Sequence, residues 1–519
     1  MTKLAHSSIV LVLFGASFVV VGCSAGKESP GASGGSSGST TRNGGTTANG
    51  GATANGGATG SGGATANGGT TASGGATANG GTTATGGATG SGGATGTGGA
   101  PGTGGAPRAG GASGTGGAPR TGGTTSAGGT TSAGGSMAGG GAIATGGTRT
   151  DGGTVINPGI DWSVKVTDST IKNTGLSGWG YWNGFTLSAI YRVYLRTQTA
   201  SYLQFIKTWA DAVVDASGNV KTTVTSLDLV EPGLDLMLLY EATQTAKYKV
   251  GPTALRQYLT TYPRTADGGF YHMTQGTGAN PTLGVDQLWA DGTYMSTPFL
   301  MKYGTLFSDP TCIDEVTKQL TVYASHLQDS ATGLFFHAYD EKGTATWADP
   351  TTHHSSEFWG RSIGWFGMAL VDDLDTIPAD HPQRAAVLKI LTDLIAGLVK
   401  YQDAATGLWY QVVNKGTVAG NWLETSCSSM YTYVIAKAVE KGYVDSSLLS
   451  VANKGYQGVL TKVSLAADGV TTSIKDICVG TDVGDYAYYI ARTKATNDLH
   501  GLGAFIIMSE QMIKMASAH

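Results

Sequence analysis

Residues 358–374 of this 519-residue chain, FWGRSIGWFGMALVDDL, begin with aromatic and polar residues and continue as a run of small and apolar residues. Apolar residues at three- and four-residue spacing predict a helix that is packed on several sides. Similar openings recur five more times in the last two-thirds of the chain. They are YWNG at 181–184, LDLVEPG at 227–233, LWADG at 288–292, LETS at 423–426 and NDLHG at 497–501. A recurring unit of this kind indicates one supersecondary element stacked on its own copies.

A second repeated signal lies between these openings. It is a glycine that follows Asp, Thr or Ser beside a short β-like run, which predicts a tight turn. The five glycines are Gly218, Gly268, Gly333, Gly407 and Gly469, at intervals of 50, 65, 74 and 62 residues.

Each opening leads into one helical pattern, and a second helical pattern follows it. The first helices, expected at 186–196, 294–303, 364–374, 430–441 and 502–515, are rich in Gly, Ala, Ser and Met, as in an inner layer. The second helices, expected at 202–214, 247–261, 313–327, 384–401 and 448–461, carry more Lys, Asp and Gln, as in a solvated outer layer. Six such hairpins predict an all-α fold, an (α/α)6 toroid. An open helical solenoid is the alternative.

The chain divides into three segments by composition. Residues 1–22 have a basic start and a short apolar run, which are typical of a secretory signal. The sequence VVGC at 20–23 fits a bacterial lipobox, so we expect Cys23 to be lipidated and to anchor an outer-membrane lipoprotein that faces the periplasm or the cell surface. An ordinary signal peptide is the alternative. Residues 23–152 are almost only Gly, Thr, Ala, Ser and Asn, which predicts a disordered tether, and residues 153–519 form the globular domain.

Charge and cysteine content narrow the class of protein. Six basic and two acidic residues lie in the first 152 residues, which leaves 26 basic and 34 acidic residues and a net charge near −8 for the domain. This charge disfavours a nucleic-acid partner. The cysteines of the domain show no metal-type spacing, so we expect no metal or cofactor, although Cys427 and Cys478 could pair. We expect a monomer.

In a toroid the starts of all six inner helices lie on one rim, so the aromatic and polar openings meet there. Four tryptophans belong to this set: Trp182, Trp289, Trp359 and Trp365. Aromatic rings that stack on sugar C–H faces, beside carboxylates and amides that bind hydroxyls, favour a carbohydrate site.

The charged residues of the openings suggest roles at this rim. Arg361 suits a substrate carboxylate, or else forms a structural ion pair. Asp291 lies among aromatic residues, so we expect burial to raise its pKa and make it a proton donor. Asp228 would either bind sugar hydroxyls or stabilise a helix start. His272 and His337 each end a β-like run at matching repeat positions, from which they could reach the pocket. The pair at 372–373, DD, is interpreted as a solvated helix end.

Six ordered motifs together resemble glycoside hydrolase family 105, the unsaturated rhamnogalacturonyl hydrolases, which are related to the unsaturated glucuronyl hydrolases of family 88. The motifs are LWADGTYMSTPFLMKYG, GLFFHAYDE, FWGRSIGWFGMALVDDL, GLWYQV, ETSCSSMYTYVIAKAVEKGY and VGDYAYYIAR with NDLHGLGAF. The resemblance implies an (α/α)6 barrel and a substrate with a 4,5-unsaturated uronic acid at its non-reducing end, in particular unsaturated galacturonyl-rhamnose from rhamnogalacturonan.

The resemblance also implies roles for single residues. Asp291 would be the catalytic acid/base, and Asp228 would bind hydroxyls beside it. The uronate would be held by Arg361, stacked by Trp365 and contacted by His337, and substrate contacts are further expected from Trp182, Trp289, Trp359 and His272. Met273 stands where the family often has Lys, and Ser362-Ile363 replace Gly-Asn after the arginine. Both departures concern the adjoining sugar more than the reaction.

Two other functions remain open from the residues alone. One is an ordinary glycosidase with two carboxylates, Asp291 with Asp228 or Glu424. The other is a tethered carbohydrate-binding lipoprotein without catalytic activity.

Overall fold

The computed structural model describes residues 159–517, so the predictions for Cys23 and for the segments before residue 153 lie outside the described residues. The described part is mostly helical, with 13 α-helices and four small antiparallel sheets of two strands each. One layer consists of α2 (Tyr181–Thr197), α4 (Gly233–Thr243), α6 (Asp291–Phe307), α8 (Gly360–Asp373), α10 (Thr425–Glu440) and α13 (Leu499–Ser517). The other consists of α1 (Trp162–Asn173), α3 (Ala200–Val213), α5 (Lys247–Thr260), α7 (Thr311–Leu327), α9 (Arg384–Tyr401) and α11 (Leu449–Leu460).

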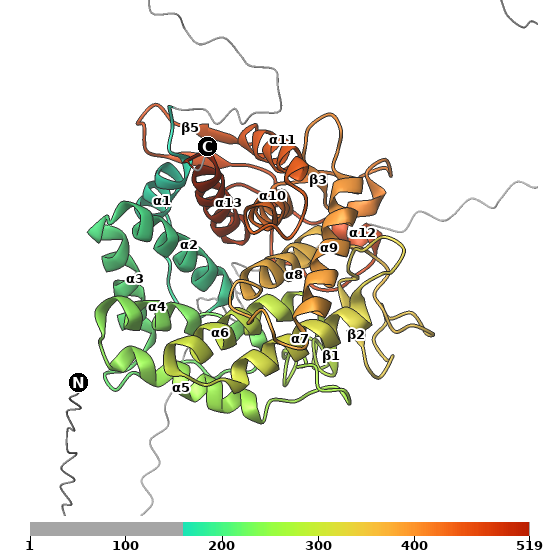
Figure 1. Cartoon of the computed structure of the whole chain (residues 1–519), viewed down its shortest axis with the longest axis horizontal. Helices are drawn as coiled ribbons and strands as arrows, with labels where there is room; N and C mark the ends of the chain where they lie inside the picture. Colours follow the sequence, from blue (N-terminus) through green and yellow to red (C-terminus); the bar gives the residue numbers. More distant parts are fainter. Residues whose placement is uncertain (1–158, 518–519) are drawn as a thin grey trace, which may run out of the picture. The chain divides into compact units, whose positions relative to one another are not determined.

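The first layer closes into a ring. Along it α2 contacts α4, α4 contacts α6, and so on through α8 and α10 to α13, which packs against α2 again. Figure 1 shows the colours of the sequence running once around this ring, with the helices of the second layer outside it. The predicted (α/α)6 toroid is therefore confirmed, and the contact of α13 with α2 excludes an open solenoid.

Burial explains which helices lie inside. In α8 every residue but Asp372 is buried, whereas in α9 only six of 18 residues are. A helix with apolar or small side chains on every face is buried on every face. Gly364 shows how close the inner helices come, because a Cβ at this position would collide with Met430 of α10.

The glycine turns join each module to the next. Gly218, Gly268, Gly333, Gly407 and Gly469 all have positive φ, between 69° and 99°, which glycine adopts without strain. The turn after α3 packs on the backbone of α5, and the turns after α7 and α9 pack on α9 and α11 in the same way. The turn after α11 meets α1, where Lys165 Nζ donates to the Gly469 carbonyl over 2.8 Å. The turns therefore set the spacing of the outer layer and complete its closure.

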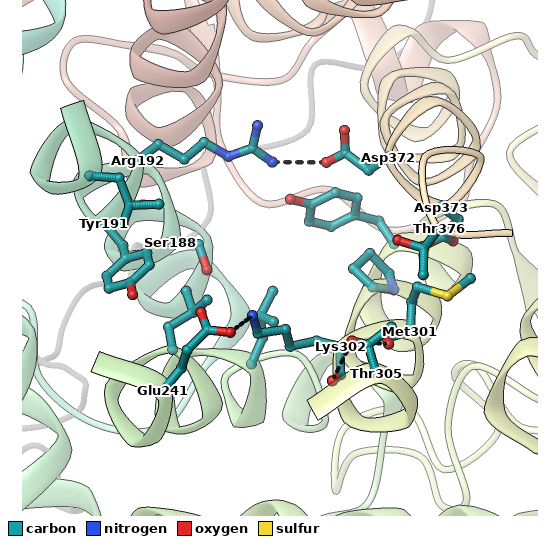
Figure 2. A pocket seen from close by; sticks show the side chains of 15 residues that line it. Ser188, Tyr191, Arg192, Glu241, Met301, Lys302, Thr305, Asp372, Asp373 and Thr376 are labelled. Atoms are coloured by element: carbon teal, nitrogen blue, oxygen red, sulfur yellow. Dashed lines mark hydrogen bonds and ion pairs between the residues drawn. The ribbon is translucent and has the colours of Figure 1, made fainter. Parts of the chain in front are cut away.

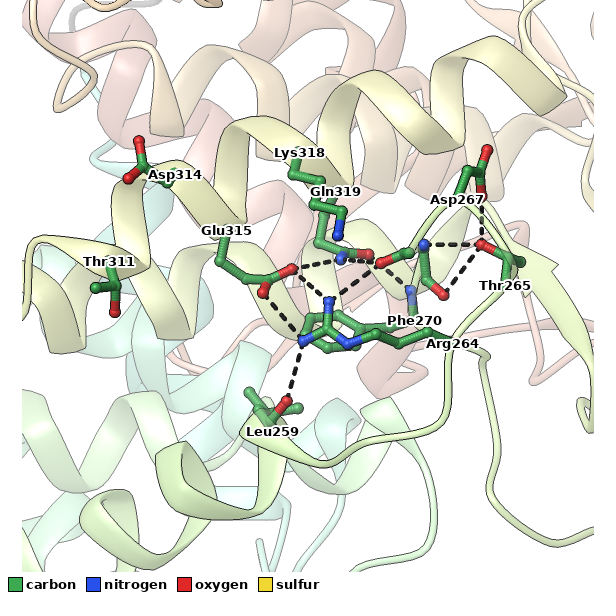
Figure 3. A network of polar contacts seen from close by, with 12 residues as sticks. Leu259, Arg264, Thr265, Asp267, Phe270, Thr311, Asp314, Glu315, Lys318 and Gln319 are labelled. Carbon is green, nitrogen blue, oxygen red and sulfur yellow. Dashed lines mark hydrogen bonds and ion pairs between the residues drawn. The ribbon is translucent and has the colours of Figure 1, made fainter.

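Figure 3 shows this junction at the turn after α5. Arg264 forms a bidentate ion pair with Glu315 of α7, with N–O distances of 2.8 and 3.0 Å. The guanidinium of Arg264 also lies 4.3 Å from the centre of the Phe270 ring. Gln319, one turn further along α7, donates to the Gly268 carbonyl and accepts from the Phe270 amide. These contacts are local to neighbouring modules, as expected for a repeat fold.

The sequence analysis missed two helices, α1 and the five-residue α12 (Tyr486–Ile490). The strands are β1 (Gln287–Trp289) with β2 (Ala338–Asp340), β3 (Trp409–Tyr410) with β4 (Leu423–Glu424), β5 (Val463–Leu465) with β6 (Thr472–Ile474), and β7 (Ile477–Cys478) with β8 (Lys494–Ala495). Over residues 159–517 no helix has both the length and the apolar character needed to cross a bilayer.

Candidate active site

Asp291 and His337 are brought together by the β1–β2 sheet. Trp289 pairs with Ala338, and the Ala290 amide donates to the His337 carbonyl over 2.8 Å. Asp291 follows directly as the first residue of α6. Two segments 46 positions apart thus place a carboxylate and an imidazole side by side at a helix start.

Asp291 Oδ2 and His337 Nε2 lie 3.2 Å apart, an ion-pair distance, although neither atom has a well-aligned hydrogen-bond partner in the described residues. The Asp291 side chain is 14% exposed and that of His337 is fully covered. His337 Nδ1 lies 2.7 Å from the hydroxyl of Tyr489, which in turn accepts from the Gly484 amide. His337 is therefore held from behind and faces Asp291, not solvent.

The electrostatics of Asp291 correct one prediction. Burial raises the pKa of Asp291, as expected, but His337 and the positive charge of His272 lower it by more, so the net pKa lies below the usual value. The aromatic neighbours of Asp291 in the sequence indicated that it would be buried. They did not indicate that two imidazoles would lie beside it.

Asp228 and His272 form a second acid–imidazole pair on the same rim. The Leu227 amide donates to the His272 carbonyl, which places the 3-10 turn Leu227–Leu229 beside the strand-like segment. Asp228 Oδ2 lies 3.6 Å from His272 Nε2, and the imidazole stacks on Trp289 at 4.4 Å. Burial lowers the pKa of His272, but Asp228 raises it by more. Asp228, with a side chain 30% exposed, is the open carboxylate of the rim.

The four tryptophans do not share one environment. Trp182 is 41% exposed at the start of α2, and Trp289 is 6% exposed. Trp359 and Trp365 are each 1% exposed, and Trp365 packs edge-on against Phe185 with ring centres 4.5 Å apart. Trp359 and Trp365 were expected to stack on a sugar, but in the structure core residues cover both rings.

Arg361 differs in the same way from its expected role. It is 1% exposed, and its guanidinium donates to the carbonyls of Cys478 and Val479 over 2.5 and 2.7 Å while lying 4.8 Å from the Trp359 ring centre. These bonds hold the segment after β7 against α8. Three of its five N–H groups are therefore already used, two by these carbonyls and one by the Ser426 hydroxyl at 3.4 Å, which leaves fewer donors for a uronate.

Glu424 cannot be the second carboxylate of an ordinary glycosidase. It is completely buried, and its two oxygens accept from the amides of Ser426, Cys427 and Cys478 at 2.6–3.0 Å. It caps the start of α10. Cys427 and Cys478, which could have paired, are both free buried thiols.

The sequence analysis missed a third polar group on the rim, made of Tyr181, His500 and Asp498. His500 Nδ1 lies 2.6 Å from Asp498 Oδ1, and its Nε2 lies 2.8 Å from the Tyr181 hydroxyl. Tyr181 begins α2 and His500 lies in the first turn of α13, so the closure of the ring brings them together. Asp228 and Asp291 both lie near enough to raise the pKa of the Tyr181 phenol, beyond the effect of burial.

The opposite end of the ring holds a cavity of about 480 Å³, which Figure 2 shows between the later turns of α2, α4, α6 and α8. Its charges are paired: Arg192 with Asp372 at 2.9 Å, and Lys302 with Glu241 at 2.6 Å. Asp373 is 1% exposed, and burial raises its pKa to about 8. The interpretation of residues 372–373 as a solvated helix end is therefore wrong, because both face the interior of the ring.

A helical toroid with paired acids and imidazoles at the starts of its inner helices fits the class of carbohydrate-cleaving enzymes. Comparison with known proteins agrees, since the profile of Glycosyl Hydrolase Family 88 matches residues 161–516. The chain belongs to this family, and the protein is a glycoside hydrolase.

Particular relatives refine this placement. A family 105 glycoside hydrolase of C. acetobutylicum ATCC 824 is 34% identical, with a TM-score of 0.65 over 68% of this chain and all of the clostridial chain. The unsaturated rhamnogalacturonyl hydrolase YesR of Bacillus subtilis is 25% identical over 55% of this chain and 79% of its own. The unsaturated glucuronyl hydrolase of Bacillus sp. GL1 is 10% identical, with a TM-score of 0.51 over 69% of this chain and 95% of its own, and shares the fold.

Proposed function

We propose that the protein removes a 4,5-unsaturated uronic acid from the non-reducing end of oligosaccharides made by polysaccharide lyases. For the substrate we propose unsaturated galacturonyl-rhamnose from rhamnogalacturonan. The observation that carries the proposal is the Asp291–His337 pair at the start of α6. The names of the relatives support the substrate class, and the motifs shared with family 105 support the pectin-derived sugar.

The chemistry needs one proton donor near the double bond, because the substrate is a vinyl ether. A proton from Asp291 adds to C4, and an oxocarbenium-like centre forms at C5. The carboxylate left on Asp291 then favours addition of water at C5. The product is a hemiketal, which opens and releases the neighbouring sugar.

The lowered pKa of Asp291 is compatible with this step because His337 lies beside it. A carboxyl group with a low pKa is a stronger acid but is protonated less of the time. His337 Nε2, 3.2 Å from Asp291 Oδ2, can hold a proton and pass it to the carboxylate. The pair can therefore supply one proton from a covered site.

The test is an assay of the purified 153–519 segment against defined digests from pectin, ulvan and glycosaminoglycan lyases. We expect loss of the ultraviolet absorbance of the unsaturated uronate, fastest on the rhamnogalacturonan digest. If another digest is preferred, the proposed sugar is wrong but the reaction stands. If no digest is consumed, the proposed function is wrong.

An ordinary two-carboxylate glycosidase remains the second candidate because Asp228 is an open carboxylate on the same rim as Asp291. This function would show as hydrolysis of saturated glycosides with a defined anomeric outcome. Activity on lyase products without activity on saturated glycosides would exclude the ordinary two-carboxylate glycosidase.

We also propose that the chain is attached to the outer membrane through Cys23. Support comes from the basic start, the apolar run and the VVGC sequence at 20–23. Replacing Cys23 by Ala should move the protein from the membrane fraction to the soluble fraction. Unchanged fractionation of Cys23→Ala would contradict the proposal.

A further inference from the structure

We propose that Tyr181 takes the proton of the attacking water and passes its own hydroxyl proton to His500, with Asp498 as the positioning residue of His500. The inference deepens the proposed function and rests on it. It assigns a role to a group that joins the first and last inner helices of the ring (Figure 1).

The hydrogen bonds of His500 fix its tautomer. Asp498 accepts from the His500 backbone amide at 3.0 Å and lies 2.6 Å from Nδ1, so the ring proton is on Nδ1 when His500 is neutral. Nε2 is then an acceptor, and the group 2.8 Å from it is the Tyr181 hydroxyl. The phenol therefore donates to His500, and the free lone pair of its oxygen is left to accept another proton.

The ionisation of the three groups agrees with this direction. Burial lowers the pKa of His500, as does the nearby Arg361, while Asp498 raises it by less. Burial also raises the pKa of Tyr181, as do Asp228, Asp291 and Asp498, while Arg361 opposes them. At neutral pH the resting state is thus a neutral imidazole and a protonated phenol.

Tyr181 is also placed toward the reacting groups. Its side chain is partly exposed beside Trp182, the exposed ring of the rim, with ring centres 5.3 Å apart. Asp228 and Asp291, the carboxylates of the two acid–imidazole pairs, are among the charges that raise the pKa of its phenol.

The step balances without any further reactant. As water forms a bond to C5, one of its protons passes to the Tyr181 oxygen, and the Tyr181 hydroxyl proton passes to His500 Nε2. The positive charge of the oxocarbenium-like centre thereby ends on the imidazole, next to the Asp498 carboxylate. The order of groups, hydroxyl to imidazole to carboxylate, is that of hydrolases in which a base is oriented by an acid.

The experiment measures kcat and KM on the preferred lyase product for Tyr181→Phe, His500→Gln, Asp498→Asn and the double variant Tyr181→Phe/His500→Gln. Each single change should lower kcat by about 10²-fold, in the range for general acid–base groups, and leave KM within about 2-fold. The double variant should be no slower than Tyr181→Phe, because groups that act as a unit are not additive. Melting temperatures show whether each variant folds.

Asp498→Asn is the sharpest of these changes. Asn keeps the size and the helix-capping ability of Asp, but its amide can donate to Nδ1 and so favours the tautomer with the proton on Nε2. That tautomer cannot accept from Tyr181. The wild-type melting temperature with lowered kcat is the expected result.

Tyr248→Phe is the matched control, because Tyr248 is likewise a tyrosine whose hydroxyl donates to a side chain, the Asp211 carboxylate, over 2.6 Å, but it lies in the outer layer. Its kcat should equal that of the wild type. The inference is overturned if Tyr181→Phe keeps full kcat on a substrate that the wild type consumes, or if the losses of Tyr181→Phe and His500→Gln multiply. A wild-type enzyme that consumes no unsaturated substrate overturns the proposed function, and this inference with it.

Discussion

The two ends of the ring use charge in opposite ways. At the starts of the inner helices, Asp291 Oδ2 and His337 Nε2 face each other without aligned partners, and Asp228 is partly open to solvent. At the other end, Asp372 accepts from Arg192 at 2.9 Å and from Lys437 at 2.7 Å, and Glu241 pairs with Lys302 at 2.6 Å. Unsatisfied buried groups cost stability. One of them, Asp373 Oδ2, lies at the cavity end, but only at the rim do such groups face each other beside a partly open carboxylate, which indicates where function is located.

The largest expected effect is on Asp291. Asp291→Asn removes the proton donor and should lower kcat by about 10³-fold or more while substrate still binds. Steady-state kinetics and a binding titration measure the two effects. Asp314→Asn is the control, because Asp314 also lies 3.1 Å from a histidine, His381, but on the exposed surface. Full activity of Asp291→Asn would place the chemistry elsewhere.

The next effect concerns the pKa of Asp291. His337→Gln removes the interactions with the imidazole that lower this pKa, so the pKa should rise and Asp291 should keep its proton to higher pH. The limb of the kcat–pH profile that reports loss of this proton should move to higher pH, and the maximum kcat should fall by about 10²-fold. His326→Gln, which breaks the His326–Asp267 pair outside the rim, should leave the profile unchanged. If the kcat–pH profile of His337→Gln does not move, His337 does not set the pKa of Asp291.

At the other end, Asp372→Asn should change stability and not catalysis. Burial raises the pKa of Asp372, but Lys437 and Arg192 lower it by more, to about 2. Breaking a buried pair from one side should lower the free energy of unfolding by about 3 kcal/mol at neutral pH. The unfolded-state pKa is about 3.9, so this stability is present above about pH 4 and is lost as the pH falls toward 2. Urea unfolding at several pH values tests this, and a loss of kcat in the folded variant would contradict the contrast between the two ends.

The smallest effect is expected at the mouth of the cavity. Glu241 is 44% exposed, so Glu241→Gln, which breaks its pair with Lys302, should cost at most about 1 kcal/mol, and less in high salt. Thermal melting at two salt concentrations measures it. A larger, salt-independent cost would mean that this end is as sensitive as the rim.

The repeat pattern made most of the fold predictable. Helix periodicity and the five glycine turns indicated the inner and outer layers, and each of the five glycines has a positive φ, as a tight turn at glycine allows. The first outer helix was missed because α1 follows directly on the low-complexity segment and precedes the first opening, so no repeat marked it. The six openings, set against five predicted outer helices, were the signal that another outer helix was needed.

The site was predictable only in part, for physical reasons. The β1–β2 pairing that places His337 against Asp291 depends on register, which sequence spacing alone does not fix. Arg361 and Trp365 lie in α8, the most buried inner helix. Their side-chain chemistry suggested contacts with a ligand, whereas in the structure both side chains pack inside the protein. Tyr181 and His500 each belong to an opening, but only closure of the ring makes them neighbours.

Closure by α13 has a consequence for the timing of activity. The 19-residue helix α13 contributes His500 and packs against α2, the first inner helix. A chain without α13 would therefore have an open ring and an incomplete rim. A chain that stops short of residue 499 would contain Tyr181 but not His500, the proposed acceptor of its hydroxyl proton. The rim can hold all of its proposed groups only after the last helix has been made.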